Sequence, residues 1–362
     1  MKPTSSAVIV PIQALRFAAA LLVALGHLRH AAGQLFADFD FGPFNAHVYA
    51  AGVDVFFVIS GFIIYTACHA DFGRPAIAPR FLLKRLIRIA PMYWAFTVLF
   101  VLATGFTAGH WPAAAHLLSS LLFLPSPNAQ QQPLPVYSLG WTLNFEMLFY
   151  ALMSLALLLP GRRGPAALVA AVVALAAAGL LLAPAELPWA LWCQPIVLEF
   201  LFGLLIARWR LAGLRLAAPQ AGLLIALGIA GLLLGSQWGE ASPLWAGRAF
   251  CMGLPAALIV TACAGLRVAD ARTRGWRLAV LGGDASYALY LVHPFVIGAA
   301  ERAGPRWQLL GPAGFMALTL LATLLAALLV HRGFEQPLQR RLTQFFFTRP
   351  PAAAGRIAMK GE

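Results

Sequence analysis

Residues 8–26 read VIVPIQALRFAAALLVALG, and residues 48–67 read VYAAGVDVFFVISGFIIYTA. Each stretch is close to the roughly 20 apolar residues that cross a bilayer core as one helix. Each also contains one ionisable residue, Arg16 in the first and Asp54 in the second. Because a charge in lipid is costly, such a residue marks either a function or a buried partner. The two stretches predict a helical membrane protein.

Similar apolar runs continue along most of the 362 residues. We therefore predict an all-α fold, a polytopic membrane protein of about ten transmembrane helices. One transmembrane domain is expected over residues 1–345, followed over 346–362 by a basic cytoplasmic tail that we expect to be disordered. The predicted spans are Val8–Gly26, Val48–Ala67, Ile89–Thr104, Leu139–Leu159, Ala166–Leu182, Trp189–Ile206, Leu216–Gly235, Ala246–Gly265, Leu278–Ala299 and Leu309–Val330.

The composition agrees with a protein whose main solvent is lipid. Hydrophobic residues make up 61% of the chain and charged residues 11%, against about 45–50% and about 25% in a typical soluble domain. The four cysteines lie in or beside apolar runs and show no CxxC or His/Cys spacing. Neither a disulfide framework nor a metal site is predicted.

The formal net charge is +13, and the positive residues are concentrated on one side of the predicted membrane arrangement. Most of the 26 Lys and Arg residues lie in every second gap between the runs and near the two termini. This is the positive-inside pattern, which places both termini in the cytoplasm and the protein in the cell inner (plasma) membrane, and gives no reason to expect nucleic-acid binding. The other face of the membrane keeps only Arg29, Arg248, Arg302 and Arg306.

A few ionisable side chains fall inside the predicted spans. Arg16 and His27 are eleven residues apart, so they share one helix face about 16 Å apart along the axis. Glu146 lies at a depth compatible with a pair to either of them. A buried charge needs a partner or a role, which favours function for Arg16 and Glu146.

Other polar residues allow simpler interpretations. A histidine at a helix end, such as His27, is often only an interfacial residue, and Asp54 and His293 could merely cap helices. Glu199 and Asp284 are interpreted as structural.

A basic segment, KRLIRIAPMYW, is predicted to precede the third span and places Lys84, Arg85 and Arg88 at its cytoplasmic end. These residues could anchor the helix at lipid phosphates. They could equally hold the phosphates of a nucleotide-like donor, since guanidinium groups suit phosphate.

In combination, these motifs resemble the acyltransferase 3 family, in particular its exopolysaccharide O-acetyltransferase branch. The resemblance covers essentially the whole chain and is densest over residues 12–150. Six blocks carry it in the expected order: QALRFAAALLVALGH (13–27), GVDVFFVISGFII (52–64), KRLIRIAPMYW (84–94), GWTLNFEMLFY (140–150), SYALYLVHP (286–294) and FEQPL (334–338).

The resemblance implies an enzyme that takes an acyl group, usually acetyl, from cytoplasmic acyl-CoA. It delivers that group to a hydroxyl of an exopolysaccharide or another cell-surface or lipid-linked glycan. His27 matches the essential histidine of the family and Arg16 its partner arginine. No SGNH-type hydrolase domain follows the last predicted span, so we expect direct transfer or a separate partner, such as a glycan-assembly protein.

From the residue chemistry and the family resemblance together, we expect the phosphates of acetyl-CoA to bind Arg85, Arg88 and Lys84. Arg16 is expected to lie deeper in the membrane, along the path of the donor. His27 would act as general base, with Glu146 orienting its ring, or would carry the acyl group itself.

Asp54, His293 and Tyr287 are assigned to substrate binding. Succinyl or another short acyl group remains open. So do two other classes: a transporter of a lipid-linked glycan or of an acyl donor, without group-transfer chemistry, and a non-catalytic membrane scaffold.

Overall fold

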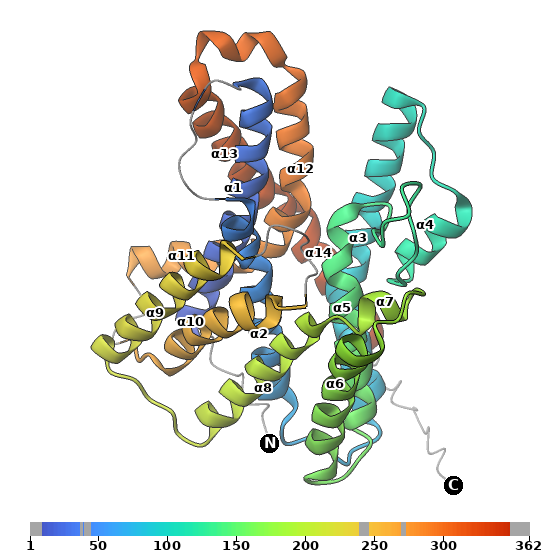
Figure 1. The fold of residues 1–362 in the computed structure, drawn as a ribbon, viewed down its shortest axis with the longest axis vertical. Coiled ribbons are helices and arrows are strands. Elements are labelled where there is room, and N and C mark those ends of the chain that lie inside the picture. The colour runs from blue at the N-terminus through green and yellow to red at the C-terminus, as the bar shows by residue number, and fades with distance from the viewer. Residues whose placement is uncertain (1–8, 37–38, 40–44, 239–245, 269–272, 348–362) are drawn as a thin grey trace, which may run out of the picture.

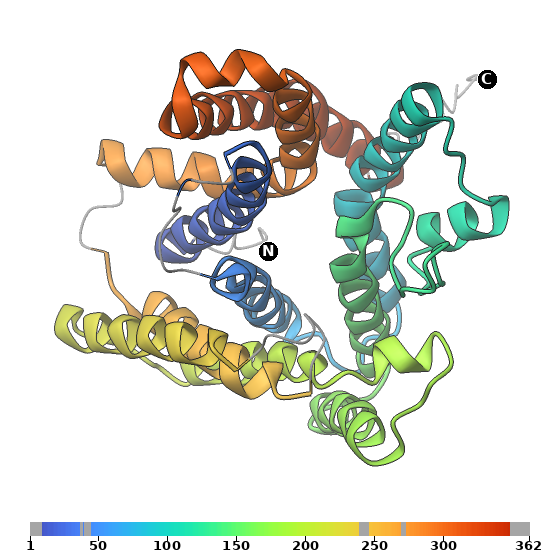
Figure 2. The same ribbon diagram turned by 45° about the horizontal axis from the view of Figure 1, so that its top comes forward.

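The computed structural model describes residues 9–36, 39, 45–238, 246–268 and 273–347, and this part of the chain is mainly helical, with no strand. Helices α1 and α2 lie in the middle, and the later helices surround them (Figure 1, Figure 2). The predicted all-α fold is confirmed. The α-helices are α1 Val10–Leu35, α2 Ala46–Cys68, α3 Ile77–Ala108, α4 Ala114–Leu121, α5 Trp141–Ala156, α6 Arg163–Leu182, α7 Trp189–Trp192, α8 Leu198–Leu211, α9 Ala218–Ser236, α10 Leu254–Gly265, α11 Arg274–Asp284, α12 Ser286–Arg302, α13 Gly311–Val330 and α14 Gln336–Phe347.

Six helices in the described part of the chain are long and apolar enough to cross a membrane. They are α1, α2, α3, α6, α9 and the continuous run Gly311–Phe347, which contains α13 and α14. The bent pair of α11 and α12 is a seventh if it is counted as one span. The other three predicted spans are also helical but shorter, since α5 has 16 residues, α8 has 14, and the third is Ala249–Gly265. Most of the predicted tail, residues 348–362, lies outside the described residues.

Proline explains why the predicted span at 189–206 is divided. Gln194, the residue before Pro195, has an extended backbone with ψ 135°, and α8 begins only at Leu198. A residue that precedes proline is driven out of the helical region because the proline ring collides with its backbone. Hydropathy does not register this break.

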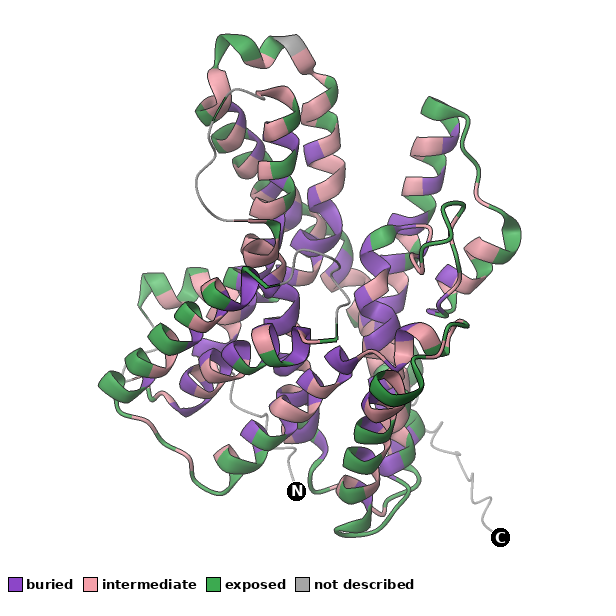
Figure 3. Cartoon of the chain, in the orientation of Figure 1, coloured by how far each residue is buried: buried purple, intermediate pink, exposed green. Residues whose placement is uncertain are grey.

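The helices differ in how they use their apolar surface. In α2, 67% of the most apolar stretch is buried in protein, against 17% in α6 and 22% in α9. Figure 3 shows buried residues in the middle of the molecule and exposed ones along the outer helices. Extended apolar surface without a protein partner indicates contact with a membrane, so α6 and α9 fit the lipid-facing side.

Helix α3 begins earlier than predicted, at Ile77. The expectation that Lys84, Arg85 and Arg88 precede the helix is therefore wrong, because all three lie within it. Lys and Arg are good helix formers, whereas a hydropathy criterion detects only the apolar part of a helix.

The capping interpretations of Asp54 and His293 are also wrong. Helix α2 begins at Ala46, where the Asn45 side chain accepts hydrogen bonds from the His47 and Val48 backbone amides, so Asp54 lies well inside the helix. Helix α12 continues past His293 to Arg302.

A bend of 68° separates α11 from α12, where one straight span was predicted. Close packing accompanies it: a Cβ atom on Gly283 would lie 2.3 Å from the carbonyl oxygen of Gln13 in α1. Only glycine allows this approach. The bend presents the first turn of α12, beginning at Ser286, to Arg16 of α1.

Candidate active site

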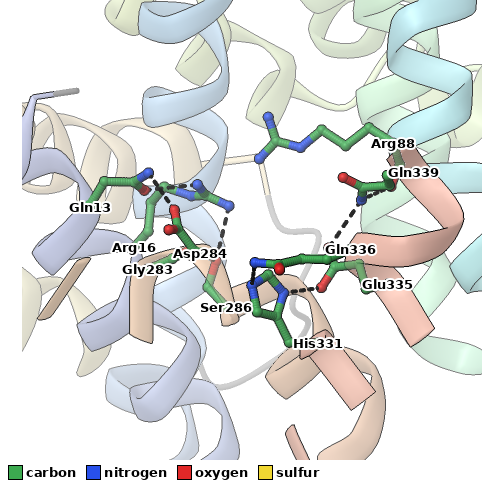
Figure 4. A network of polar contacts seen from close by, with 10 residues as sticks. All are labelled: Gln13, Arg16, Arg88, Gly283, Asp284, Ser286, His331, Glu335, Gln336 and Gln339. Atoms are coloured by element: carbon green, nitrogen blue, oxygen red, sulfur yellow. Dashed lines mark hydrogen bonds and ion pairs between the residues drawn. The ribbon is translucent and has the colours of Figure 1, made fainter. Parts of the chain in front are cut away.

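Arg16 connects α1 to the bend between α11 and α12. Its buried guanidinium donates to Gln13 Oε1 at 2.9 Å and to Ser286 Oγ at 3.0 Å. Ser286 Oγ donates to the carbonyl oxygen of Gly283 at 2.8 Å, and Gln13 Nε2 donates to Asp284 Oδ1 at 2.9 Å (Figure 4). Neutral partners hold the Arg16 side chain directly, so its positive charge stays available to a ligand.

A cavity of about 100 Å³ adjoins this group and extends between α1, α2, α3, α5 and α12. Its apolar wall comes mainly from α2, and its polar groups come from all five helices. The lining residues are Arg16, Val53, Phe56, Phe57, Ile59, Ser60, Ile63, Ile64, Arg85, Arg88, Ile89, Thr142, Leu143, Glu146, Tyr150, Ser286, Tyr287 and Tyr290.

The cavity is positively charged, because three guanidinium groups and one carboxylate line it among the residues that the structure describes. Arg16 and Arg88 both direct their guanidinium groups into the space between the two halves of the network in Figure 4. Glu146 is held by neutral donors: its Oε1 accepts from Ser60 Oγ at 2.8 Å and from the Tyr150 hydroxyl. An apolar cavity with excess positive charge favours an anionic ligand with an apolar part.

Helix α14 contacts the backbone of α3 at Arg88. Gln339 Nε2 donates to the Arg88 carbonyl oxygen and to Glu335 Oε1, both at 3.2 Å (Figure 4). Glu335 Oε2 lies 2.6 Å from His331 Nδ1, and Gln336 Nε2 lies 2.8 Å from His331 Nε2. Within the FEQPL block, the buried Glu335 is thus paired to histidine rather than to an arginine of the cavity.

Two histidines meet further along the same pair of helices. His27 Nδ1 of α1 lies 3.3 Å from His293 Nε2 of α12, and the ring centroids are 4.8 Å apart. His27 is exposed, whereas His293 is fully buried. The structure therefore gives His27 a histidine partner, while Glu146 bonds to Ser60 and Tyr150 instead.

Tyr290 lies between the cavity and the histidine pair. It lines the cavity, its hydroxyl lies 3.1 Å from both Thr142 Oγ1 and the Leu139 carbonyl oxygen, and its ring centroid is 6.1 Å from that of His293. Arg16 and His27 remain about 16 Å apart along α1. A ligand must be extended to reach from one to the other.

The structure brings together most of the residues selected from the sequence. Arg16, Arg85, Arg88, Glu146 and Tyr287 line the cavity, and the Tyr287 hydroxyl also donates to the Ile89 carbonyl oxygen at 2.9 Å. His27 and His293 form the histidine pair.

Lys84 and Asp54 lie elsewhere. Lys84 is exposed, with its ammonium group 5.5 Å from the Phe347 ring centroid. Asp54 accepts two hydrogen bonds of 2.8 Å from Arg248 in a fully buried ion pair. Among the described residues, no group of three or more His, Cys, Asp or Glu side chains could hold a metal ion.

Sequence reasoning missed several contributors. Ser60, Tyr150, Ser286 and Tyr290 are uncharged, so a search for ionisable residues inside spans passed over them, although each lies within a quoted motif block. The distribution of Lys and Arg places Arg248 on the non-cytoplasmic face and does not reveal the partner that it has inside the membrane. Its pairing with Asp54 could have been suspected from charge balance inside the spans.

Comparisons with known proteins agree with this arrangement. Residues 10–332 match the family described as "Acyltransferase domain". The exopolysaccharide production protein ExoZ of Rhizobium meliloti (strain 1021) is 34% identical over 302 residues, which cover 81% of this chain and 90% of that protein. The acyltransferase MdmB of Streptomyces mycarofaciens is 31% identical over an alignment of 385 positions, covering 94% and 93% of the two chains. No solved structure matches.

The fold and the cavity define a polytopic helical protein with an arginine-lined cavity and a histidine pair on the same two helices, α1 and α12. The family match identifies the class more narrowly: the chain belongs to the acyltransferase 3 family. It is an O-acyltransferase enzyme of the membrane.

Proposed function

We propose that the protein moves an acetyl or other short acyl group from cytoplasmic acyl-CoA to a hydroxyl of an exopolysaccharide or other cell-surface glycan. The observation that supports this proposal is that α1 and α12 contribute residues both to the arginine-lined cavity and to the histidine pair. The similarity to an exopolysaccharide production protein supports a glycan as acceptor.

In this proposal the cavity receives the pantetheine arm of the donor, with the thioester directed past Tyr290 toward His27. The cavity has a volume of about 100 Å³, below the roughly 300–1,000 Å³ of a pocket that encloses a drug-sized ligand, and it therefore suits a narrow arm better than a whole coenzyme. Arg85 and Arg88 come from α3, on the side supported by α14, and are assigned to the phosphates. Arg16 is assigned to a phosphate of the donor, because the thioester must reach His27, about 16 Å further along α1.

His27 is assigned as general base. The acceptor hydroxyl gives its proton to His27 while its oxygen attacks the thioester carbonyl carbon. The carbon–sulfur bond then breaks, and the thiolate of CoA takes the proton from His27 and leaves as the thiol. Imidazole suits both steps because its ordinary pKa of about 6.5 allows it to gain and lose a proton near neutrality.

The proposal includes an orientation. We assign ten spans, both termini in the cytoplasm and a location in the inner membrane, as the Lys and Arg distribution indicates. The transmembrane domain is assigned to residues 1–345 and the cytoplasmic tail to 346–362. The partners are acyl-CoA, a cell-surface or lipid-linked glycan, the bilayer and proteins of glycan assembly.

The test is transfer of labelled acetyl from acetyl-CoA to exopolysaccharide, or to its lipid-linked precursor, in membrane vesicles. The wild type is compared with His27→Ala and with His30→Ala at matched membrane expression. His30 is an exposed histidine on the same helix, outside the pair, and serves as the control.

We expect transfer by the wild type and by His30→Ala, and at least about a hundredfold loss in His27→Ala, the scale of general-base catalysis. Equal transfer by all three would remove His27 from the chemistry. Movement of glycan across the vesicle membrane without labelling would instead indicate a transporter.

A further inference from the structure

The inference concerns His293, and it rests on the proposed function. His293 contacts the Leu289 carbonyl oxygen through Nδ1, at 3.2 Å, and His27 through Nε2. Its side chain is fully buried, and the Tyr290 ring lies on another side. A glycan approaching the exposed His27 would meet His27 before His293.

Backbone carbonyl groups fix where the hydrogens of the pair lie. A carbonyl oxygen can only accept, so His293 Nδ1 must carry hydrogen to bond with Leu289, and its Nε2 then holds a bare lone pair. His27 Nδ1 lies 3.0 Å from the carbonyl oxygen of Val23, so it too must carry hydrogen. The same N–H faces His293 Nε2 at 3.3 Å.

This assignment leaves one nitrogen free on the exposed ring. If His27 carries its hydrogen on Nδ1, Nε2 has the lone pair that a general base needs. The opposite arrangement, with hydrogen on His293 Nε2, would leave His293 Nδ1 facing a carbonyl oxygen without hydrogen unless the ring were charged. A charged ring is disfavoured there, because it would be fully buried beside the His27 and Tyr290 rings, with no carboxylate among those contacts.

We propose that His293 is a positioning residue: its Nε2 shares the His27 Nδ1–H with the Val23 carbonyl oxygen, so that the two acceptors keep His27 Nε2 unprotonated in the resting enzyme, and it stabilises the His27 imidazolium during transfer. When Nε2 of His27 takes the acceptor proton, its ring becomes a cation. The Nδ1–H bond to His293 then becomes charge-assisted and stronger. The carboxylate partner of histidine in serine hydrolases has a comparable role, filled here by a neutral ring suited to an apolar surrounding.

Three substitutions of His293 separate this role from simple filling of space. Gln carries a polar atom near the Nε2 position and can still accept from His27, whereas Asn carries one near the Nδ1 position and reaches only Leu289. Leu fills the space without either bond. Labelled acetyl transfer is measured for the wild type, His293→Gln, His293→Asn and His293→Leu, with KM for acetyl-CoA and melting in detergent for each.

We expect kcat to fall by about a hundredfold in His293→Asn and His293→Leu, and by no more than about tenfold in His293→Gln, with KM for acetyl-CoA unchanged. A space-filling role would make His293→Gln no more active than His293→Leu. Wild-type rates in all three variants would overturn the inference while leaving the proposed function intact. Absence of transfer by the wild type would overturn both.

A second readout uses the wild-type protein and needs no variant to fold. Diethylpyrocarbonate acylates a bare imidazole nitrogen, and mass spectrometry of peptides reports the rate at each histidine. His27 should react several-fold faster than the exposed His30 of the same helix, because its Nε2 is held unprotonated. An equal or slower rate at His27 would overturn the assignment of the hydrogens.

Discussion

Arg85 and Arg88 present guanidinium groups to a cavity that contains a single carboxylate, which suits the phosphates of a donor. Replacing Arg88 by alanine removes a charge-assisted interaction of about 1.5–3 kcal/mol. We expect KM for acetyl-CoA to rise by about tenfold to a hundredfold, with a smaller change in kcat. Steady-state transfer from labelled acetyl-CoA over a range of donor concentrations measures both constants.

Arg80 provides the matched control for this prediction. It lies on the same helix, is exposed and does not line the cavity. Arg80→Ala should leave KM within about twofold of the wild type, since exposed charges contribute little. A similar rise in both variants would mean that general attraction of an anion, and not a defined site, produces the effect.

Asp54 forms a buried ion pair with Arg248, which gives it a structural role that the sequence did not reveal. Asp54→Asn removes the carboxylate that accepts two hydrogen bonds from the buried guanidinium. We expect a loss of about 3–5 kcal/mol in stability, seen as a lower apparent melting temperature and lower yield in detergent.

Asp71→Asn is the comparison, because the ion pair of Asp71 with Arg74 is partly exposed, at 25% and 65% of the side chains. That variant should melt within a few degrees of the wild type. If Asp54→Asn melted normally but raised KM for the glycan, the substrate-binding role expected from the sequence would be correct.

At the scale of elements, the contact between α1 and α11 depends on Gly283. A Cβ atom there would lie 2.3 Å from the Gln13 carbonyl oxygen, and backbone cannot move aside as a side chain can. Gly283→Ala should separate the two helices and disturb the Arg16–Ser286 bond, at a cost of about 1–3 kcal/mol. Melting in detergent and acetyl transfer should both decline.

Gly275 in the same helix is the control, since a Cβ atom there meets nothing within 4 Å. Gly275→Ala should be neutral or slightly stabilising, because alanine has the higher helix propensity. Equal losses in the two variants would show that α11 tolerates no side chain at either glycine, and would remove the close approach to α1 as the cause.

The presence of each long helix could be predicted from the sequence, but the residues at which the helices begin and end could not. An apolar run has a strong average hydropathy, which identified α1, α2 and α3. Their ends depend on local chemistry that hydropathy ignores: Asn45 caps α2, and basic residues extend α3 back to Ile77. The bend between α11 and α12 depends on packing against α1.

At the scale of the whole molecule, the orientation can be tested by labelling from one side of the membrane. Cysteines are introduced at the exposed positions Gln130, Arg162 and Arg215 in a cysteine-free background. In the ten-span arrangement, an impermeant maleimide added outside spheroplasts should label Gln130→Cys and neither of the other two.

Arg215→Cys is the decisive position, because it follows the helical segment divided at Pro195. If that segment enters and leaves the membrane on one side, Arg215→Cys becomes accessible from outside while Arg162→Cys stays protected. Lysed cells serve as the control and should label all three.

The sequence by itself determined the class of protein, the order of its helices and the charged residues that line the cavity. Hydropathy and motif blocks are local properties, and each can be assessed within a short window of chain. The tertiary structure decided which residues meet: Arg16 with Ser286, 270 positions away, His27 with His293, 266 positions away, and Asp54 with Arg248. Such contacts depend on how helices pack in three dimensions, and nothing in the local sequence around either partner specifies the other.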